Sequence, residues 1–355
     1  MPHNILKYLL IGLLFVSCAK EESRPDNIEN STDNLSSGWE VPISQLVLTH
    51  NGPDRIVSID APFFKPISKS NLSDNEIVFA YRYGDSIKIY PQNTVWGHEI
   101  INDRIADHFF AITFCPLTGS ALAWDRTING KVTEFGVSGH LFNDNLIPYD
   151  RNTNNYWSQM QLQSIKGNQA GNILRNEYLL MASAETIKLS FPQAMVLIDT
   201  TAHQCDSVCN GGKHATQNNS SKVNSSNSSN GDYFGIIRKN IVHDDEALLF
   251  GTHLFTDSIT IYRTNYAGDD IIVIGNNKQK YISAFIINSS TEKTKFIAVQ
   301  NMLPIAFTDS QGNNYDLTGF VLSGPLKGHQ LNFPISYLAH GFAWDLFYQN
   351  NWEHY

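Results

Sequence analysis

Short runs of β-branched and aromatic residues alternate along the chain with polar segments that contain Gly, Pro, Asn or Asp. Runs of this length and composition, bounded by such breaks, are typical of β-strands. Helical periodicity is scarce, so we expect only short helices: one at residues 94–102, where Thr94 provides a cap, and others near Trp157 and Trp344. The pattern therefore predicts a mainly β, β-rich α+β fold. The predicted strands are residues 76–83, 86–90, 109–114, 248–253, 258–262, 270–274 and 282–287.

The N-terminus departs from this pattern. His3 and Lys7 precede an apolar run at residues 8–16 that ends at Ser17 and Cys18, which is the order of a secretory signal. The run is far shorter than the roughly 20 residues of a membrane-spanning helix. A small residue followed by Cys resembles the lipobox of bacterial lipoproteins. We therefore expect Cys18 to be the lipidated first residue of the mature protein, the alternative being an ordinary signal with an incidental Cys.

Lipidation of Cys18 would make the membrane a partner and the cell envelope the location of this protein. More than one acyl chain is needed for stable anchoring, and bacterial lipoproteins generally carry more than one. We expect attachment to the outer membrane. The next residues, 19–22 (AKEE), resemble the surface-export signal of some lipoproteins, which adds the outer surface as a candidate location.

Composition divides the rest of the chain into three kinds of segment. Residues 19–40 are polar and acidic without apolar periodicity, which predicts a disordered tether. Residues 41–200 and 233–355 have the composition of folded β-rich domains, and residues 201–232 form a Cys-containing, Asn- and Ser-rich linker or loop insertion. A net charge of −9 argues against nucleic acid as a partner, because nucleic acid requires a basic patch. Small molecules and proteins both stay open as partners.

Three segments of the first half recur, in the same order, in the second half. This order predicts two related β domains that arose by tandem duplication. The first echo aligns Asp85 with Asp257 and Tyr90 with Tyr262. The echoes are "GDSIKIYPQN" (84–93) with "TDSITIYRTN" (256–265), "DRNTNNY" (150–156) with "DSQGNNY" (309–315), and "KGNQAGNIL" (166–174) with "SGPLKGHQL" (323–331).

The spacing of the echoes predicts that the second half lacks the segment "TVWGHEIIND". His98 and Asp103 then have no counterpart there. The same alignment puts Asn276 or Asn277 opposite Cys115. Residues that only one copy requires are better candidates for function than for architecture, so these three residues of the first half become candidate site residues.

Cys115 follows a predicted strand in "FAITFCPLTGSA" and supports three interpretations. A thiol beside His98 can act as a thiolate nucleophile, with Asp103 orienting the imidazole. The same thiol together with His98 and His140 is a ligand set suited to copper or zinc. The third interpretation is a buried, unreactive thiol, which is common for free cysteines.

Further candidate residues follow in "FGVSGHLFND" and "DRNTNNYW". Ser138 lies in a Gly-flanked turn that lacks the full pattern of a nucleophile elbow. Arg151 has the geometry to hold an anionic ligand bidentately, or it pairs structurally with Asp150 or Glu99. Trp157 is a candidate ligand platform, although a core position is the commoner role of a Trp.

Cys205 and Cys209 lie in "HQCDSVCNGGKH" within the insertion. Their spacing is not a standard zinc pattern. In an exported protein a local disulfide between them is the simplest expectation, with metal binding and free thiols as alternatives. A disulfide would leave Cys115 unpaired.

The segments "GPDRIVSIDAPFF", "IYPQNTVWGHEIIND", "FAITFCPLTGSALAWDR" and "SGPLKGHQL" resemble the successive motifs of the bacterial family known as domain of unknown function 3179. The resemblance extends from about residue 50 to beyond Trp344. It implies that His98 and Cys115 belong to a shared signature, but it implies no reaction. The chain departs from the family at Thr118 and Gly119, where many relatives have a second Cys, and this argues against a two-thiol centre.

These observations leave three classes of function. The first is an exported lipoprotein whose Cys/His-centred pocket binds copper or zinc or acts in redox chemistry. The second is an enzyme that depends on a Cys115 and His98 dyad. The third is a non-catalytic binding or scaffold protein of the cell surface, which requires neither arrangement.

Overall fold

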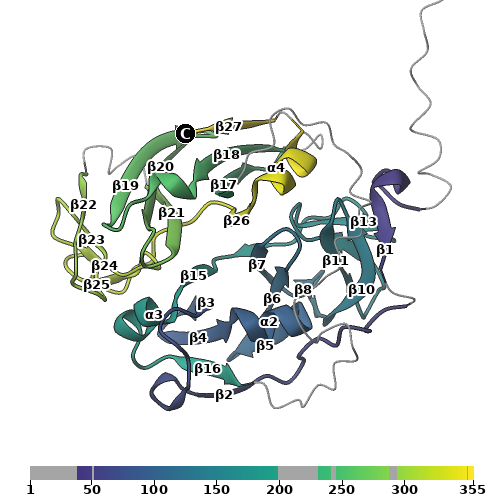
Figure 1. Cartoon of the computed structure of the whole chain (residues 1–355), viewed down its shortest axis with the longest axis horizontal. Coiled ribbons are helices and arrows are strands. Elements are labelled where there is room, and N and C mark those ends of the chain that lie inside the picture. Colours follow the sequence, from purple (N-terminus) through teal and green to yellow (C-terminus); the bar gives the residue numbers. More distant parts are fainter. Residues whose placement is uncertain (1–37, 50–51, 199–230, 241–244, 288–293, 350) are drawn as a thin grey trace, which may run out of the picture.

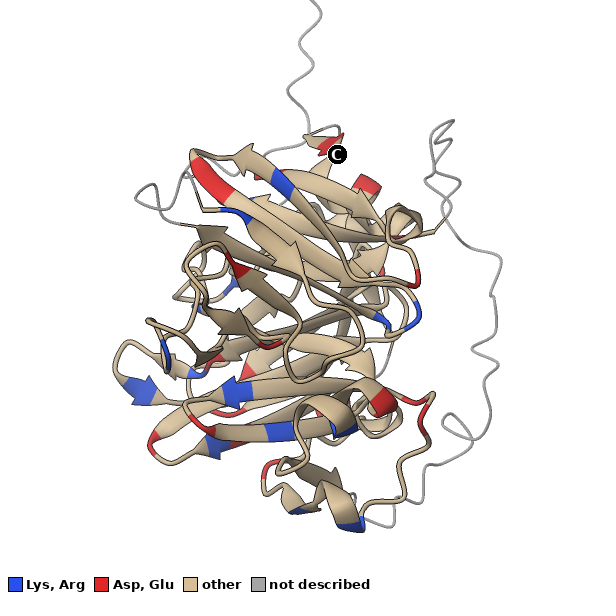
Figure 2. Cartoon of the chain, turned by 90° about the vertical axis from the view of Figure 1, so that its left-hand side faces the viewer, with Lys and Arg blue, Asp and Glu red and all other residues tan. Residues whose placement is uncertain are grey.

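The computed structural model describes residues 38–49, 52–198, 231–240, 245–287, 294–349 and 351–355 (Figure 1). The described chain is mainly β, with several sheets and three short α-helices, which confirms the predicted fold class. Within these residues, no helix is long and apolar enough to cross a membrane. Basic and acidic residues are interspersed over the side of the protein drawn in Figure 2.

The first half contains three main sheets and two α-helices. The 3-10 helices η1 (Ile43–Gln45) and η2 (Ile67–Lys69) lie near its start. Its other elements are β1 (Leu46–Leu48), β2 (Phe63–Pro66), β3 (Ile77–Tyr83), β4 (Ser86–Pro91), α2 (Gln92–His98), β5 (Ile100–Ile105), β6 (His108–Cys115), β7 (Ser120–Asp125), β8 (Thr127–Ile128), β9 (Lys131–Val132), β10 (Phe135–Phe142), β11 (Asn145–Asp150), β12 (Tyr156–Ser158), β13 (Gln163–Lys166), β14 (Asn176–Glu177), β15 (Leu180–Ser183), α3 (Ala184–Ser190) and β16 (Met195–Ile198).

The second half also contains three sheets and has one α-helix. Its elements are β17 (Asp232–Arg238), β18 (Glu246–Gly251), η3 (Thr252–Leu254), β19 (Thr260–Tyr266), β20 (Asp269–Asn276), β21 (Tyr281–Ile287), β22 (Phe296–Ala298), β23 (Phe307–Asp309), β24 (Asn314–Tyr315), β25 (Val321–Ser323), β26 (Ser336–His340), α4 (Gly341–Tyr348) and β27 (Trp352–His354).

The two halves share one strand connectivity. In the first half β3 pairs antiparallel with β15 and β4, β4 pairs parallel with β16, and α3 joins β15 to β16. In the second half β17, β26, β18, β27 and α4 repeat this arrangement. The three strands β5, β6 and β7 likewise correspond to β19, β20 and β21, and β10–β13 correspond to β22–β25. Origin of this likeness by tandem duplication stays a prediction.

The strand connectivity corrects the first sequence echo. Tyr90 lies at the end of β4, whose counterpart is β18, whereas Tyr262 lies on β19, whose counterpart is β5. The predicted alignment of Asp85 and Tyr90 with Asp257 and Tyr262 is therefore wrong. The likeness of the two segments reflects the β-branched composition that strands share.

The second echo does fall on corresponding elements. Asp150 ends β11 and accepts a hydrogen bond from the backbone of Asn155 in the following turn (3.2 Å). Asp309 ends β23 and accepts one from the backbone of Asn313 (2.9 Å). The repeated Asp and Asn residues thus stabilise the same turn in each half, since a short carboxylate side chain can bond nearby backbone N–H groups.

The predicted absence of the "TVWGHEIIND" segment from the second half is also wrong. Residues 92–99 join β4 to β5, and a connection of the same length, residues 252–259, joins β18 to β19. The register of the hairpins then assigns Cys115, which pairs with Ser120, to the position of Asn276, which pairs with Tyr281. Asn276 is one of the two residues that the sequence placed opposite Cys115.

All seven predicted strands are present, with ends shifted by a few residues. The predicted helix at residues 94–102 is shorter than expected, because α2 ends at His98 and β5 begins at Ile100. The helix predicted near Trp344 is α4. The helix predicted near Trp157 is wrong, since this residue lies in strand β12.

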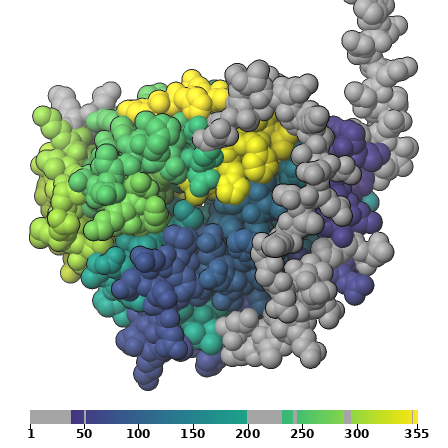
Figure 3. All heavy atoms as spheres, in the orientation of Figure 1, coloured from purple at the N-terminus to yellow at the C-terminus, as the bar shows by residue number. Residues whose placement is uncertain are grey.

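The two halves pack reciprocally. Strand β15 of the first half lies beside β21 of the second, and β26 of the second half lies beside β7 of the first. In the space-filling view the green and yellow second half rests directly on the blue and teal first half (Figure 3). Each half therefore supplies a sheet that covers the hairpin strands of the other.

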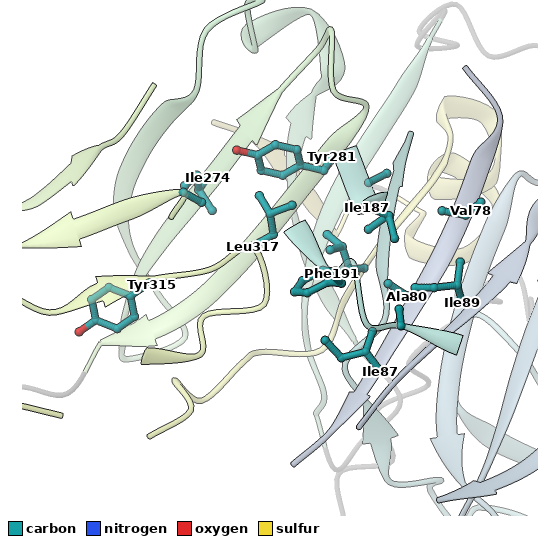
Figure 4. Close-up of a cluster of buried hydrophobic side chains, with 14 of the residues drawn as sticks. Val78, Ala80, Ile87, Ile89, Ile187, Phe191, Ile274, Tyr281, Tyr315 and Leu317 are labelled. Carbon is teal, nitrogen blue, oxygen red and sulfur yellow. The ribbon is translucent and has the colours of Figure 1, made fainter. Parts of the chain in front are cut away.

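The hydrophobic cores follow this exchange. One cluster joins Val78, Ile89 and Phe191 of the first half to Ile274 and Leu317 of the second (Figure 4). A second cluster joins residues of β7 and β12 in the first half to residues of β17, β18 and α4 in the second. Because the main cores draw side chains from both halves, we expect the halves to unfold as one cooperative unit.

The packing of Gly235 against Trp344 gives a test of this shared core. Trp344 on α4 is fully buried, and its Nε1 donates to the carbonyl oxygens of Tyr233 and Ala339. A methyl group at Gly235 on β17 would overlap the indole. We expect Gly235→Ala to lower the free energy of unfolding in urea by about 1–3 kcal/mol, the usual cost of overpacking.

The matched control is Gly97→Ala on α2, where an added methyl group meets no neighbouring atom. A helical Gly→Ala change is neutral or raises stability by up to about 1 kcal/mol. Equal unfolding free energies for Gly235→Ala and the wild type would contradict the packing described for Trp344.

Candidate functional site

Cys115 is the last residue of β6 and is 2% exposed. Its Sγ lies 3.6 Å from the backbone oxygen of Asp144. The side chain belongs to the cluster that contains Trp124 and Leu146, whereas the neighbouring Phe114 belongs to the cluster on the other face of the sheet. Successive strand residues point to opposite faces, so the thiol is directed into the interior of the first half.

A buried hydrogen-bond network lies beside this thiol. Asn145 Nδ2 donates to Thr118 Oγ1 (2.9 Å) and to Gln159 Oε1 (2.7 Å). Ser120 Oγ also donates to Gln159 Oε1 (2.7 Å), and Gln159 Nε2 donates to Thr113 Oγ1 (3.0 Å). All five side chains are at most 1% exposed. Because buried polar groups are costly unless satisfied, this network fixes the hairpin that carries "TFCPLTGS".

The second half uses apolar packing at the corresponding place. By the registers of the two hairpins, Thr113 in the first half corresponds to Ile274 in the second, and Ser120 corresponds to Tyr281. Both residues of the second half belong to the shared hydrophobic core. At these two positions, residues of the hydrophobic core in the second half thus take the place of two hydroxyl groups of the network in the first half.

Two titratable groups of this region have raised pKa values. Burial raises the pKa of Glu99 to about 8. Burial also raises the pKa of the Cys115 thiol, the negative charge of Glu99 raises it further, and hydrogen bonds from Thr118 and the backbone of Leu146 act in the opposite direction. At neutral pH both groups are mainly protonated, so the resting thiol is a weak nucleophile.

His98 is buried at the C-terminal end of α2. Its Nδ1 lies 2.6 Å from the backbone oxygen of Val57. The next residue, Glu99, has a left-handed backbone (φ 58°) and caps the helix through its N–H, which donates to Val95 O. The hydrogen bond to Val57 ties the imidazole to the chain segment before β2. The thiol of Cys115 donates to a different residue, Asp144, so these two hydrogen bonds do not join the two side chains.

Asp103 lies on β5 and is 4% exposed. Both of its carboxylate oxygens accept bonds from Lys88 Nζ (2.8 and 2.9 Å), and Tyr90 OH donates to one of them at 2.6 Å. This carboxylate is held in a buried ion pair. The contacts support a structural role for Asp103, in place of the predicted role of orienting His98.

His140 lies on β10, which belongs to a different sheet from β6, the strand that carries Cys115. Its ring packs against Trp39 and Tyr156, with ring centroids 5.6 and 5.7 Å away. Burial lowers the pKa of His140, which favours the neutral imidazole. This surrounding is an aromatic core, and the contacts recorded for His140 differ from those of Cys115 and His98.

Ser138 and Trp157 are both 1% exposed. Ser138 Oγ accepts from the backbone N–H of His140 (3.1 Å) where the β10–β11 register shifts, so it stabilises the turn-like bulge. Trp157 donates from Nε1 to Asp150 (3.2 Å) within the core. Neither contact supports the predicted ligand-binding role.

Arg151 is surrounded by carboxylates. Its guanidinium donates to Asp60 (2.6 Å), Glu134 (3.2 Å) and Asp54 (3.2 Å). The predicted pairing with Asp150 or Glu99 is wrong, because the turn after β11 directs the side chain to these three acids. With its charge compensated several times over, Arg151 has little capacity left for an anionic ligand.

The described part of the chain contains no group of three or more His, Cys, Asp or Glu side chains arranged to hold a metal ion. Metal binding by Cys115, His98 and His140 therefore stays a prediction. Cys18, Cys205 and Cys209 lie outside the described residues, and so does the predicted disulfide.

A cavity of about 500 Å³ lies between the halves, on the face of the β6–β7 hairpin away from the thiol. Corresponding strands line it: Phe79 on β3 pairs with Met181, just as Phe234 on β17 pairs with Leu338, and all four side chains lie in its wall. Among the described residues, its lining does not include Cys115, His98 or His140. Other wall residues are Ile77, Trp96, Phe114, Pro116, Ala121, Phe255 and Ile282.

Sequence reasoning missed this cavity because its walls are far apart in the chain. One signal was present: Pro116 and Gly119 directly follow Cys115 in the family signature and both line the cavity. A methyl group at Gly119 would lie 2.7 Å from the ring of His340, and the backbone N–H of His340 donates to Thr118 O (2.8 Å). The signature thus sets the contact between the halves.

The thiol environment predicts a pH-dependent reactivity. With Cys18, Cys205 and Cys209 replaced by Ser, Cys115 should react slowly with Ellman's reagent in the native state and rapidly in urea. At pH 9 Glu99 is ionised and disfavours the thiolate, so Glu99→Gln should accelerate native labelling several-fold. At pH 6.5 Glu99 is protonated, so the two rates should agree.

The control is Glu185→Gln, which changes an exposed acid at the start of α3. This variant should label at the wild-type rate at both pH values. A Cys115 thiol that labels fast in the native protein, or a Glu99→Gln effect that is the same at both pH values, would contradict the environment described.

Comparison with known proteins identifies a family and no activity. Residues 53–351 match the family described as a protein of unknown function (DUF3179). No curated protein and no solved structure matches the chain. Because the match covers most of the chain, from before β2 to the end of α4, this protein belongs to the DUF3179 family.

Proposed function

We propose that this protein is a lipid-anchored binding protein of the cell envelope, which holds a small organic molecule in the cavity between its halves. The observation that carries the proposal is the cavity itself, about 500 Å³ in volume and lined mainly by aromatic and aliphatic side chains. Ligand sites of proteins are typically concave, largely apolar and of about 300–1,000 Å³.

The frame of the cavity supports this proposal. Its walls are strands of paired sheets, and the hairpin at Pro116 and Gly119 is fixed by the buried network around Gln159. Sites built on rigid elements need little rearrangement to bind. Trp96 is 46% exposed and lines the cavity, so one aromatic ring is accessible both to solvent and to a ligand.

The proposal of a lipid anchor is argued from the sequence alone. The short apolar run at residues 8–16 followed by Ser17 and Cys18 supports cleavage and lipidation at Cys18. The membrane is then the partner of the N-terminus, the outer membrane is the proposed location, and the polar segment that follows Cys18 separates the folded part from the lipid surface.

A thiol-based activity at Cys115 is the second candidate. It is favoured by the polar network, which the second half replaces by apolar packing, and by Glu99, a carboxyl group able to exchange a proton near neutral pH. Burial of the thiol and its raised pKa weigh against a nucleophile in the resting state. Binding of copper or zinc by Cys115, His98 and His140 has the least support, because the contacts described above give these three side chains different neighbours.

Filling the cavity should abolish ligand binding. Ala121 lies in the wall on β7, and Ala121→Phe would occupy the space beside Phe114. We expect the wild type to bind the neutral fluorescent probe N-phenyl-1-naphthylamine and Ala121→Phe to weaken this binding at least about tenfold, since the ligand loses its contact surface. Fluorescence titration measures both.

The control for this experiment is Ala61→Phe, which adds the same ring at an exposed position outside the cavity. It should leave probe binding unchanged. Equal binding by all three proteins would place the probe elsewhere and contradict the proposed site, and absence of binding by the wild type would count against a binding function.

Lipidation has its own test. Cells that express the full chain should incorporate labelled palmitate into the wild-type protein, and Cys18→Ser should lose the label, because the lipidated thiol is removed. Cys115→Ser serves as the control and should retain full label. Equal label in all three proteins would contradict acylation at Cys18.

A further inference from the structure

The described lining of the cavity between the halves includes an acidic, a basic and an imidazole side chain, those of Asp232, Lys280 and His340. Each has a partner: His340 Nδ1 lies 2.7 Å from Asp232 Oδ1, and Lys280 Nζ donates to Asn277 Oδ1 (3.2 Å). The partner of Lys280 is a neutral amide, so this bond leaves the ammonium charge uncompensated. The described lining thus contains one basic group and, apart from it, the Asp232 and His340 pair.

The Asp232 and His340 pair presents acceptors. Its recorded bond uses Oδ1 and Nδ1, which leaves Asp232 Oδ2 and His340 Nε2 for other partners. When Nδ1 carries the proton that it donates to the carboxylate, Nε2 of the neutral ring is an acceptor. The two side chains are 45% and 42% exposed, so a ligand in the cavity can reach them.

The pair is also held in place. Asp232 and His340 face each other across the β17–β26 ladder, where they are direct register partners. The imidazole lies over Gly119, which leaves no room for a larger residue, and the His340 backbone is tied to Thr118 of the first half. The acceptor atoms thus have a fixed position at the junction of the two halves.

We infer that the cavity selects an amphipathic molecule whose aromatic or hydrocarbon body contacts Phe79, Phe114 and Phe234 and whose hydroxyl or amide N–H donates to the Asp232 and His340 pair. This inference rests on the proposed binding function and adds the class of ligand. A carboxylate or sulfonate, which only accepts hydrogen bonds, would gain no hydrogen bond from two acceptors.

Three probes with one ring system separate these chemistries: 2-naphthol, which donates; 2-methoxynaphthalene, which only accepts; and naphthalene-2-sulfonate, an anion. Equilibrium dialysis against the full folded chain should give 2-naphthol about threefold to tenfold tighter binding than 2-methoxynaphthalene, the worth of one hydrogen bond. The sulfonate also has no donor, so the loss of the Asp232 carboxylate should not weaken its binding. Asp232→Ala should remove the advantage of 2-naphthol and leave 2-methoxynaphthalene unchanged.

The control is Asp269→Ala, which removes an exposed acid at the start of β20 outside the cavity. It should preserve the order of the three probes. If all probes bind and Ala121→Phe weakens each, but 2-naphthol has no advantage over 2-methoxynaphthalene, the ligand class is wrong while the binding site stands. If no probe responds to Ala121→Phe, the proposed binding site itself is overturned.

Discussion

The packing of each half's sheet against the hairpin strands of the other half is the contact on which the rest of this structure depends. Strand β15 lies beside β21 and β26 beside β7, and the two largest hydrophobic clusters collect side chains from both halves. Neither half covers both faces of its central sheet alone: Phe79 and Tyr81 of β3 pack within the first half, whereas Val78 and Ala80 on the opposite face of that strand pack against the second half. The cavity is the space that remains where these two covers meet.

This constraint gives the family signature a physical meaning. The segment around Cys115 holds together a polar network through Thr118, Ser120 and Gln159, and its tip bonds to His340 of the other half. The residues that looked like a reactive centre therefore also set the distance between the halves. A family signature can reflect a structural contact between two halves of a protein as well as residues that take part in a reaction.

The sequence predicted the strands well because runs of β-branched and aromatic residues fit a pleated sheet wherever the sheet lies. It missed α3, although Ser183 caps that helix as a sequence signal would suggest, and it predicted a helix at Trp157 where the chain is extended. Cys115 was found because a signature is local. Phe79 and Phe234 were missed because only the folded chain brings them to one cavity, and such long-range contacts leave no trace in local periodicity.

The two walls of the cavity follow the same strand pattern but differ in their side chains. The second half presents Asp232 and His340 to the cavity. At the corresponding register the first half has Ile77, which also lines the cavity, and Ser183, which instead caps α3. Because the two walls have matching backbones but different side chains, the two sides of the cavity differ in their chemistry. A molecule bound in such a cavity has one orientation of lowest energy. During evolution the side chains of one wall can change while the other wall and the shared backbone stay the same.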